Sequence, residues 1–266
     1  MQVFILKNYE EMSREAALEV KDRLLKKPNL VMGLATGSTP LGLYKELIRM
    51  HKDEGLSFKH VITFNLDEYL GIAQDHKQSY FRFMRENLFK HLDINIKNVH
   101  VPNGMAKPCD IDEYCDWYES RIKKFGGIDL QVLGIGRDGH IGFNEPGSSL
   151  GSRTRVKTLT EETIQDNSRF FKDQSEVPTY SITMGVGTVM EAKEIILLAN
   201  GKSKANVISI TIEGGVTAQV TASVLQLHRR VNVFLDEEAA SLLKRKQYYN
   251  FVAKATRKFE KMARAK

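Results

Sequence analysis

Apolar and polar positions form two kinds of segment along this chain. Short runs rich in Val, Ile and Leu are typical of buried strands, and longer stretches with apolar residues three or four positions apart are typical of helices. The expected strand and helix pairs are 3–6 with 9–27, 30–35 with 41–51, 61–64 with 80–91, 99–101 with 111–125, 194–198 with 204–212, and 231–235 with a C-terminal helix, and one further strand is expected at 128–133. This alternation predicts an α/β fold with a mostly parallel sheet and helices on both faces.

Length and composition agree with one large domain. The chain has 266 residues, is 42% hydrophobic, and contains no repeat, low-complexity tract or linker rich in Pro and Gly. We therefore expect a single domain over residues 1–266. The apolar run at 3–6 is too short for a signal peptide, and no stretch approaches the length of a membrane span. The two cysteines, Cys109 and Cys115, have a spacing that suits neither a zinc pair nor an obvious disulfide, which favours a reducing cytoplasm.

Positive charge is concentrated at the C-terminus. Residues 241–266 hold nine Lys and Arg against Glu260 alone, a net charge of +8, so the other 240 residues sum to −2 of the total +6. Apolar residues recur here at helical spacing, namely Tyr248, Phe251, Val252, Ala255, Phe259 and Met262. We expect a helix that packs this apolar face and exposes a basic one. Nucleic-acid or membrane binding would need stacking aromatics on the basic face or a binding motif, and we expect neither partner.

The segment 133–146, which reads LGIGRDGHIGFNEP, has the composition of an active-site loop. It carries Asp138, His140, Asn144 and Glu145 among several glycines, directly after the expected strand 128–133. Neither a core strand nor a helix needs that mixture. Open α/β sheets bind ligands outside the carboxyl ends of their strands, which is where this loop should lie.

A dinucleotide site is the alternative interpretation of this loop. Residues 134–139 match the spacing of the Gly-rich fingerprint, which requires a helix at its third glycine and an acidic residue about 20 positions later. Here Gly142, Pro146 and Gly147 oppose a helix, and the stretch 153–157 is basic. These features disfavour nucleotide binding.

Three other groups of polar residues fall at the ends of expected elements. Thr36, Gly37, Ser38 and Thr39 precede a helix, where they would either cap it or cradle an anion with backbone N–H groups. Asp67 and Glu68 follow an apolar strand, and would form a helix cap, a solvated turn or a carboxylate base. Two further stretches, 167–170 with Arg169 and 201–205 with Lys204, offer either surface charge or the cations that a phosphate ester requires.

Taken together, these segments resemble the glucosamine-6-phosphate deaminase family. The matching motifs are TGSTP at 36–40, FNLDEY at 64–69, GRDGHIGFNEP at 136–146, SRTRVKTLT at 152–160, NSRFF at 167–171, MGVGT at 184–188 and LQLH at 225–228. They keep the family order over nearly the whole chain. Ser38 is a departure, because many relatives have a second glycine there. The resemblance implies a modified Rossmann-like α/β sheet, shared with 6-phosphogluconolactonases and ribose-5-phosphate isomerases.

The same resemblance implies conversion of glucosamine 6-phosphate and water to fructose 6-phosphate and ammonia, with no cofactor and no metal. His140 would open the sugar ring with Asp138 and Glu145 as its carboxylate partners, and Asp67 would abstract the proton at C2. The phosphate would be held by Thr36, Gly37, Ser38, Thr39, Arg169 and Lys204. A structural role for His140, a metal site at Asp138, His140 and Glu145, and a lactonase of the same fold remain alternatives.

Regulation and assembly are also implied by the resemblance alone. In allosteric members N-acetylglucosamine 6-phosphate binds between subunits through residues that match Ser148, Arg155, Lys157 and Thr158, and the assembly is a hexamer. Arg155 and Lys157 would otherwise be exposed alternate positions of a strand. A ligand-sensing domain of a sugar-responsive repressor would share the fold but needs an attached helix-turn-helix. Because this chain begins directly with its first expected strand, we do not expect one.

Overall fold

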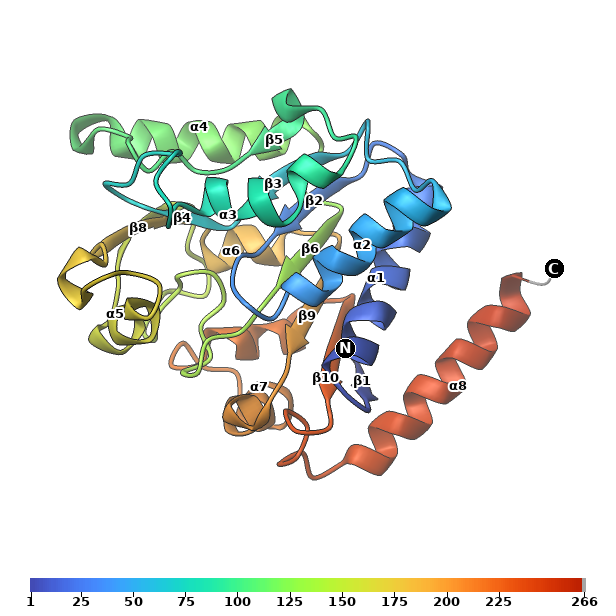
Figure 1. Ribbon diagram of the computed structural model, residues 1–266. Coiled ribbons are helices and arrows are strands. Elements are labelled where there is room, and N and C mark those ends of the chain that lie inside the picture. Colours follow the sequence, from blue (N-terminus) through green and yellow to red (C-terminus); the bar gives the residue numbers. More distant parts are fainter. Residues whose placement is uncertain (265–266) are drawn as a thin grey trace.

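A seven-stranded sheet runs through the centre of the molecule (Figure 1). The computed structural model describes residues 1–264. Every strand pair in this sheet is parallel. In spatial order the strands are β1 (Gln2–Leu6), β10 (Val231–Asp236), β9 (Glu194–Ala199), β6 (Leu130–Leu133), β2 (Val31–Leu34), β3 (Ile62–Asn65) and β5 (Val99–His100). The prediction of a mostly parallel α/β sheet is confirmed.

Helices cover both faces of the sheet, as predicted. One face packs against α1 (Tyr9–Lys26), α2 (Leu41–Glu54) and α3 (Tyr80–Asn87), and the other against α4 (Ile111–Lys124), α6 (Val186–Met190) and α7 (Ala205–Glu213). The remaining helices are α5 (Glu161–Ser168), α8 (Lys246–Arg264) and short 3-10 turns at Phe89–His91, Ile96–Asn98, Pro108–Asp110, Gln174–Glu176, Lys202–Lys204 and Thr221–Leu227. Among the described residues, no helix is long and apolar enough to span a bilayer.

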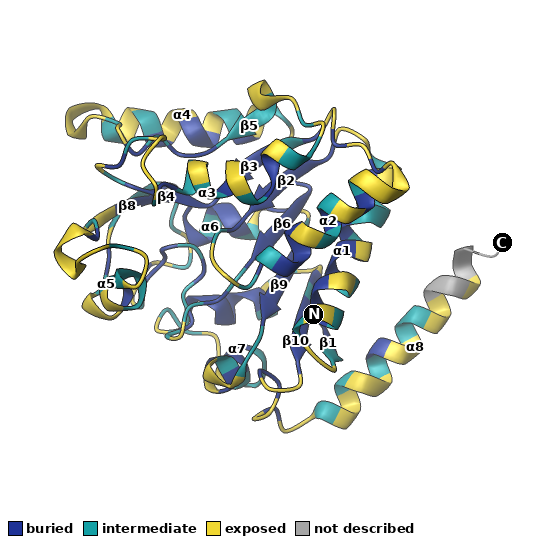
Figure 2. Ribbon diagram, in the orientation of Figure 1, coloured by how far each residue is buried: buried dark blue, intermediate teal, exposed yellow. Residues whose placement is uncertain are grey.

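Strand side chains alternate between two apolar cores, which is why the central strands read as continuous apolar runs. In β10, Val233 and Leu235 belong to one core, whereas Phe234 belongs to the other and stacks on Phe4 with ring centroids 4.9 Å apart. Figure 2 shows the strands buried and the outer sides of the helices exposed. The sheet is therefore a rigid support for the loops at its edge.

A second, three-stranded sheet was not expected from the sequence. It is antiparallel and pairs β4 (Asp67–Tyr69) with β8 (Tyr180–Thr183), and β8 with β7 (Arg155–Thr158). Asp67 and Glu68 are consequently buried strand residues, so the alternative of a solvated turn for this pair is wrong. The three-residue strand escaped detection because its pairing partners are more than 80 residues away in the chain.

The C-terminal helix α8 forms as predicted but packs a different face. The predicted apolar residues Tyr248, Phe251, Phe259 and Met262 are 59–71% exposed, whereas Ala253 is buried in the core that includes Phe4. The small Ala253 lets α8 approach β1 closely. Arg257 completes this contact: its guanidinium lies 4.7 Å from the centroid of the Phe4 ring, and it forms an ion pair of 2.7 Å with Glu15.

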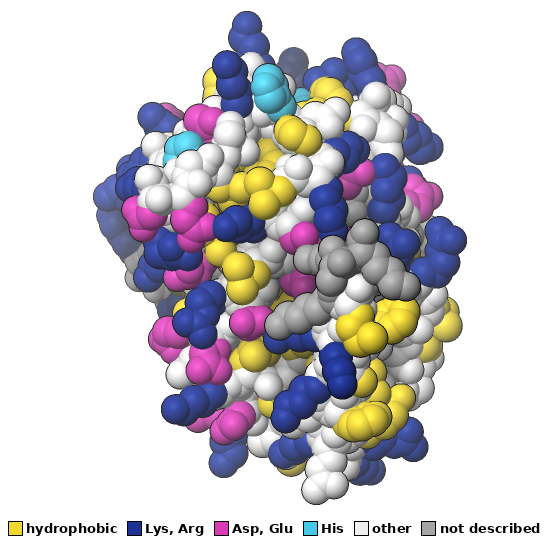
Figure 3. Space-filling view, turned by 90° about the vertical axis from the view of Figure 1, so that its right-hand side faces the viewer, with side chains coloured by type: hydrophobic (Ala, Val, Ile, Leu, Met, Phe, Trp, Pro, Cys, Tyr) yellow, Lys and Arg dark blue, Asp and Glu magenta, His cyan; other side chains and the backbone are white. Residues whose placement is uncertain are grey.

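Figure 3 views the molecule from the side where α8 lies. Lys and Arg side chains and hydrophobic side chains are interspersed on this face. The prediction that α8 exposes basic residues holds for Lys254 and Lys258, which are exposed.

Candidate active site

The cavity that gathers the predicted site residues lies at the carboxyl ends of the central strands. Its volume is about 410 Å3, and its lining comes from the loops that follow β2, β3, β6 and β9, together with α5. The predicted residues that line it are Thr36, Gly37, Ser38, Thr39, Asp67, His140, Arg169 and Lys204. This position is where parallel sheets place their ligands. We refer to it below as the central cavity.

We call residues 134–145 the His140 loop. It contains no helix, so the helix that the dinucleotide fingerprint requires at its third glycine is absent from this loop. It folds back on itself, since the backbone N–H of Gly136 donates a hydrogen bond to the His140 carbonyl oxygen at 2.9 Å. A Cβ atom at Gly136 would lie 2.5 Å from the His140 ring. Only glycine therefore lets the imidazole rest on the backbone at this point.

His140 lies between two carboxylates. Its Nδ1 atom is 2.8 Å from Asp138 Oδ1 and 3.2 Å from Glu145 Oε2, and Glu145 is almost fully buried. Burial of His140 favours the neutral ring, but the two carboxylates outweigh it and raise the His140 pKa to about 9. Burial likewise opposes ionisation of Asp138, and pairing with His140 outweighs it and lowers the Asp138 pKa to about 2. At neutral pH the His140 ring is therefore a protonated imidazolium paired with Asp138 and Glu145.

Asp67 has the opposite environment. It is 6% exposed, and no hydrogen bond reaches its carboxylate from the residues that the structure describes. Burial and the charge of Glu68 raise the pKa of Asp67 to about 7, against the opposing effect of His140. Gly142 allows the His140 loop to approach this carboxylate, because a Cβ atom there would lie 3.3 Å from Asp67 Oδ2. A carboxylate with such a pKa suits a general base near neutral pH.

Its neighbour Glu68 is engaged in structure. The Glu68 carboxylate accepts hydrogen bonds from the backbone N–H groups of Tyr69, Tyr80 and Phe81 at 2.9–3.0 Å. Tyr80 and Phe81 open α3, so Glu68 satisfies the free donors at that helix N-terminus. Burial nevertheless raises the Glu68 pKa to about 7, against those three hydrogen bonds. The two adjacent acids thus have different partners.

Another part of the central cavity's lining is cationic and rich in hydroxyl groups. Lys204 and Arg169 line it with the 36–39 loop, and burial, reinforced by Arg137, lowers the pKa of Lys204. The N-cap of α2 is Pro40, and the N–H of Gly42 in the first turn donates a hydrogen bond to the Tyr9 hydroxyl at 2.6 Å. Simple capping by the side chain of Ser38 or Thr39 does not occur. Thr39 instead contacts Asn200 through Oγ1 at 2.8 Å. This part of the cavity has the chemistry of an anion subsite.

The four residues predicted for regulation do not line the central cavity. Arg155, Lys157 and Thr158 lie on β7, and Ser148 is buried in the turn that follows Glu145. Arg155 is half-buried and donates a hydrogen bond from Nη1 to Asn144 Oδ1 at 2.9 Å. In the small sheet Arg155 and Asp67 both pair with Thr183, so the three residues form one row across it.

Several side chains that support the site were not assigned a role from the sequence. Asn144 is buried and donates hydrogen bonds to the Ile141 and Met184 carbonyl oxygens, which fixes the His140 loop to the end of β8. Thr183 accepts a hydrogen bond from the Phe143 N–H at 3.1 Å. Arg137 and Asp166 line the cavity. Asn144 and Arg137 lie within the motif itself, so only their roles were missed.

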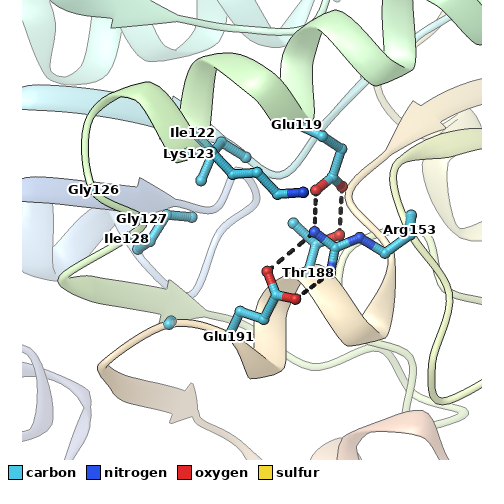
Figure 4. A pocket seen from close by; sticks show the side chains of 10 residues that line it. Glu119, Ile122, Lys123, Gly126, Gly127, Ile128, Arg153, Thr188 and Glu191 are labelled. Carbon is cyan, nitrogen blue, oxygen red and sulfur yellow. Dashed lines mark hydrogen bonds and ion pairs between the residues drawn. The ribbon is translucent and has the colours of Figure 1, made fainter.

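A smaller cavity of about 200 Å3 lies elsewhere, beside α4 and α6 (Figure 4). Its polar wall is a network in which Glu119 contacts Arg153 and accepts a hydrogen bond from Thr188 Oγ1 at 2.5 Å, while Arg153 also pairs with Glu191 at 2.6 Å. Thr154 donates to Glu119 as well, through both its N–H and its hydroxyl group. The network anchors the segment that leads into β7, and none of the predicted catalytic residues lines this cavity.

Comparison with known proteins places this chain in a family. The sequence pattern of the family described as glucosamine-6-phosphate isomerases/6-phosphogluconolactonase matches residues 7–234. The chain belongs to this family. Two similar curated relatives are glucosamine-6-phosphate deaminases. The one from Thermoanaerobacter sp. (strain X514) is 57% identical over 91% of this chain and 95% of the relative. The one from Shewanella woodyi is 53% identical over 95% of each of the two chains.

Solved structures of the glucosamine-6-phosphate isomerase/6-phosphogluconolactonase family share the fold. One, described as a monomeric glucosamine-6-phosphate deaminase, is 45% identical, covers 91% of this chain and 100% of its own, and gives a TM-score of 0.88. The 6-phosphogluconolactonase from Trypanosoma brucei is 21% identical, covers 90% and 97% of the two chains, and gives a TM-score of 0.72. The predicted family is confirmed.

Proposed function

We propose that this chain converts glucosamine 6-phosphate and water to fructose 6-phosphate and ammonia. Its curated relatives at 49–57% identity over more than nine tenths of the chain carry the name glucosamine-6-phosphate deaminase, and this chain is one as well. The observation that supports the residue roles is that Asp67 and His140 line the same cavity as the cationic residues Arg169 and Lys204. A sugar phosphate needs both pairs of residues, one for the reacting carbons and one for the phosphate.

The phosphate binds first in this proposal. Arg169 and Lys204 supply charge, and the 36–39 loop supplies hydroxyl and backbone N–H groups. Burial of Lys204 lowers its pKa in the free protein, and a phosphate dianion reverses that trend because it favours the ammonium form. Binding energy from the phosphate then fixes the sugar carbons against Asp67.

Ring opening is the task of His140. The ring oxygen must gain a proton while the O1 hydroxyl loses one. The imidazolium, held by Asp138 and Glu145, donates a proton to the ring oxygen and recovers one from O1. Asp138 and Glu145 orient the ring and do not line the cavity themselves.

Asp67 performs the chemistry at C2. Its ionised carboxylate accepts the C2 proton of the open aldehyde. O1 takes a proton from the C2 ammonium group of the substrate, which gives an enolamine, and Asp67 then returns its proton to C1. The product is an iminium at C2. Water adds at C2, and the nitrogen leaves as ammonia after it gains a proton. A pKa of about 7 lets Asp67 both accept and return the proton near neutral pH.

Ammonia release from glucosamine 6-phosphate by the purified protein tests this function directly. Asp138, His140 and Glu145 place their ligand atoms within 4.8 Å of one another, so a metal is the competing explanation for this cluster. We expect full activity after exhaustive dialysis against a chelator. Hydrolysis of 6-phosphogluconolactone without ammonia release from the amino sugar would assign the chain to the lactonase branch of the family instead.

We also propose that N-acetylglucosamine 6-phosphate activates the enzyme through Ser148, Arg155, Lys157 and Thr158, in a cytoplasmic hexamer. The hydrogen bond from Arg155 to Asn144 and the row of Arg155, Thr183 and Asp67 support such coupling, since both connect β7 to catalytic elements. An activator should shift apparent substrate affinity roughly 5–150-fold. Lys157→Ala should abolish the shift and retain activity at saturating substrate, and analytical ultracentrifugation measures the assembly.

A further inference from the structure

Arg137 lies in the His140 loop and lines the central cavity, where its side chain contacts α5. Its Nη1 atom forms an ion pair of 3.3 Å with Asp166 Oδ1 of α5. Both side chains are well exposed, at 63% and 43%, and both residues line the cavity. The pair therefore links the catalytic loop to α5 at the rim of the site.

Arg137 belongs electrostatically to the phosphate side of the cavity. The charges that act on the Lys204 ammonium are those of Arg137, Asp166, Asp138 and Arg169. Arg137 and Arg169 oppose its ionisation, which means that each of them lies close enough to Lys204 to repel its positive charge. Asp166 and Asp138 partly compensate for this repulsion, although Asp138 is already paired with His140.

We propose that Arg137 is a further ligand of the substrate phosphate, which exchanges Asp166 for the phosphate dianion when substrate binds. This inference rests on the proposed function for its substrate and extends the phosphate subsite beyond Arg169, Lys204 and the 36–39 loop. Arg137 is a binding residue in this role.

The exchange of partners is energetically favourable. Ion pairs between exposed side chains contribute little to stability, so release of Asp166 costs little. A phosphate dianion carries twice the charge of a carboxylate and accepts two parallel hydrogen bonds from a guanidinium. The phosphate dianion would bind among Arg137, Arg169 and Lys204. Its negative charge offsets the repulsion that Lys204 experiences from the two arginines.

The test compares Arg137→Ala with two other variants. We expect Arg137→Ala to raise KM for glucosamine 6-phosphate by about tenfold or more and to change kcat by less than about threefold, because a charged hydrogen bond is lost from binding. The inhibition constant of inorganic phosphate should rise by a similar factor. Arg230→Ala is the matched control, since Arg230 also forms an exposed ion pair of 3.3 Å, with Glu194, and does not line the cavity.

Asp166→Asn separates phosphate binding from a purely structural link. If Arg137 binds phosphate, freeing it from Asp166 should leave KM and the phosphate inhibition constant equal or lower. If the pair only fastens the loop to α5, Asp166→Asn and Arg137→Ala should harm KM and kcat alike, and the proposal is wrong. If the KM of Arg137→Ala equals that of the control Arg230→Ala, Arg137 does not bind the phosphate and the proposal is wrong. Calorimetric titration with inorganic phosphate measures the same effect without turnover, so it remains decisive even if the protein releases no ammonia.

Discussion

The His140 loop and strand β4 bring ionisable groups to the same cavity in opposite ways. In the loop a histidine pairs with two carboxylates, and the His140 pKa rises to about 9 while the Asp138 pKa falls to about 2. In β4 two adjacent carboxylates are buried without a cation in direct contact, and the pKa of each rises to about 7. The loop stabilises charge, and the strand opposes it.

This difference separates two catalytic tasks. A held imidazolium donates a proton over a wide pH range, whereas a carboxylate with a pKa near 7 accepts and returns one. Environments that push the pKa values of neighbouring groups apart are the usual way to assign acid and base roles in one site. Each of the following experiments alters one member of the comparison.

Asp67→Asn should have the largest effect. The amide cannot accept the C2 proton, so turnover should fall by about 10²–10⁴-fold, the range of a general base. In deuterated water the wild type should incorporate deuterium at C2 of the amino sugar from fructose 6-phosphate and ammonia, and the variant should not. A loss of less than about tenfold would assign the proton transfer to another group.

Glu68→Gln is the matched control for that substitution. The neighbouring carboxylate has a similar raised pKa but accepts three backbone hydrogen bonds. We expect reduced stability from weaker support of α3, and C2 exchange that remains well above that of Asp67→Asn. Equal loss of exchange in both variants would mean that the pair acts as one unit.

His140→Gln should slow turnover less, by about 10²-fold, at the lower end of acid–base effects, because sugar rings also open spontaneously in water. A substrate analogue fixed in the open form should bind the variant as well as it binds the wild type. The comparison of open and closed forms by steady-state kinetics and titration checks this. Equal losses for both would move His140 from ring opening to C2 chemistry or to loop structure.

The pH dependence of kcat/KM should report the pKa values of both Asp67 and His140. Asp67 must be ionised to act as the base, so kcat/KM should fall about tenfold for each pH unit below about 7. It should also fall above about 9, where His140 loses its proton. Asp138→Asn removes one carboxylate from His140 and should move only the alkaline limb toward lower pH. Movement of the acid limb instead would show that the assignments are reversed.

The sequence revealed the loop far better than the strand. Gly136, Asp138, His140 and Glu145 are close in sequence, and their mixture of glycine, acid and imidazole has no use in a core element. The main sheet was equally visible, because apolar runs and helical spacing are local patterns. Strand β4 was not, since DEY resembles a turn and its partner Tyr180–Thr183 is remote.

The sequence also did not predict which face of a helix packs or which distant side chains pair. In α8 the larger apolar stripe predicted the wrong face, because the contact with β1 depends on the fit of Ala253 and Arg257 around Phe4. The bond from Arg155 to Asn144 and the pair of Arg137 and Asp166 join segments whose spatial proximity is set by the second sheet and α5. Pattern periodicity carries no information about such pairings.

The smallest effect that we predict is on stability. The folded-state pKa of Asp67 is raised about three units above 3.8, so its ionised form destabilises the fold. The folded protein therefore binds one proton more than the unfolded chain between about pH 4 and 7, and stability falls as pH rises through that window. The full shift corresponds to at most about 4 kcal/mol.

Asp67→Asn removes this penalty. Water in the open cavity screens the charge, so we expect a gain of about 1 kcal/mol at pH 8, or 2–4 °C in Tm. The gain should shrink toward zero as the pH falls to about 4, where Asp67 is neutral in both states. Thermal unfolding of the wild type and the variant at pH 5, 6, 7 and 8 measures this trend. A gain that is independent of pH would mean that the pKa of Asp67 is the same in the folded and unfolded states, and would remove the physical basis for its role as the base.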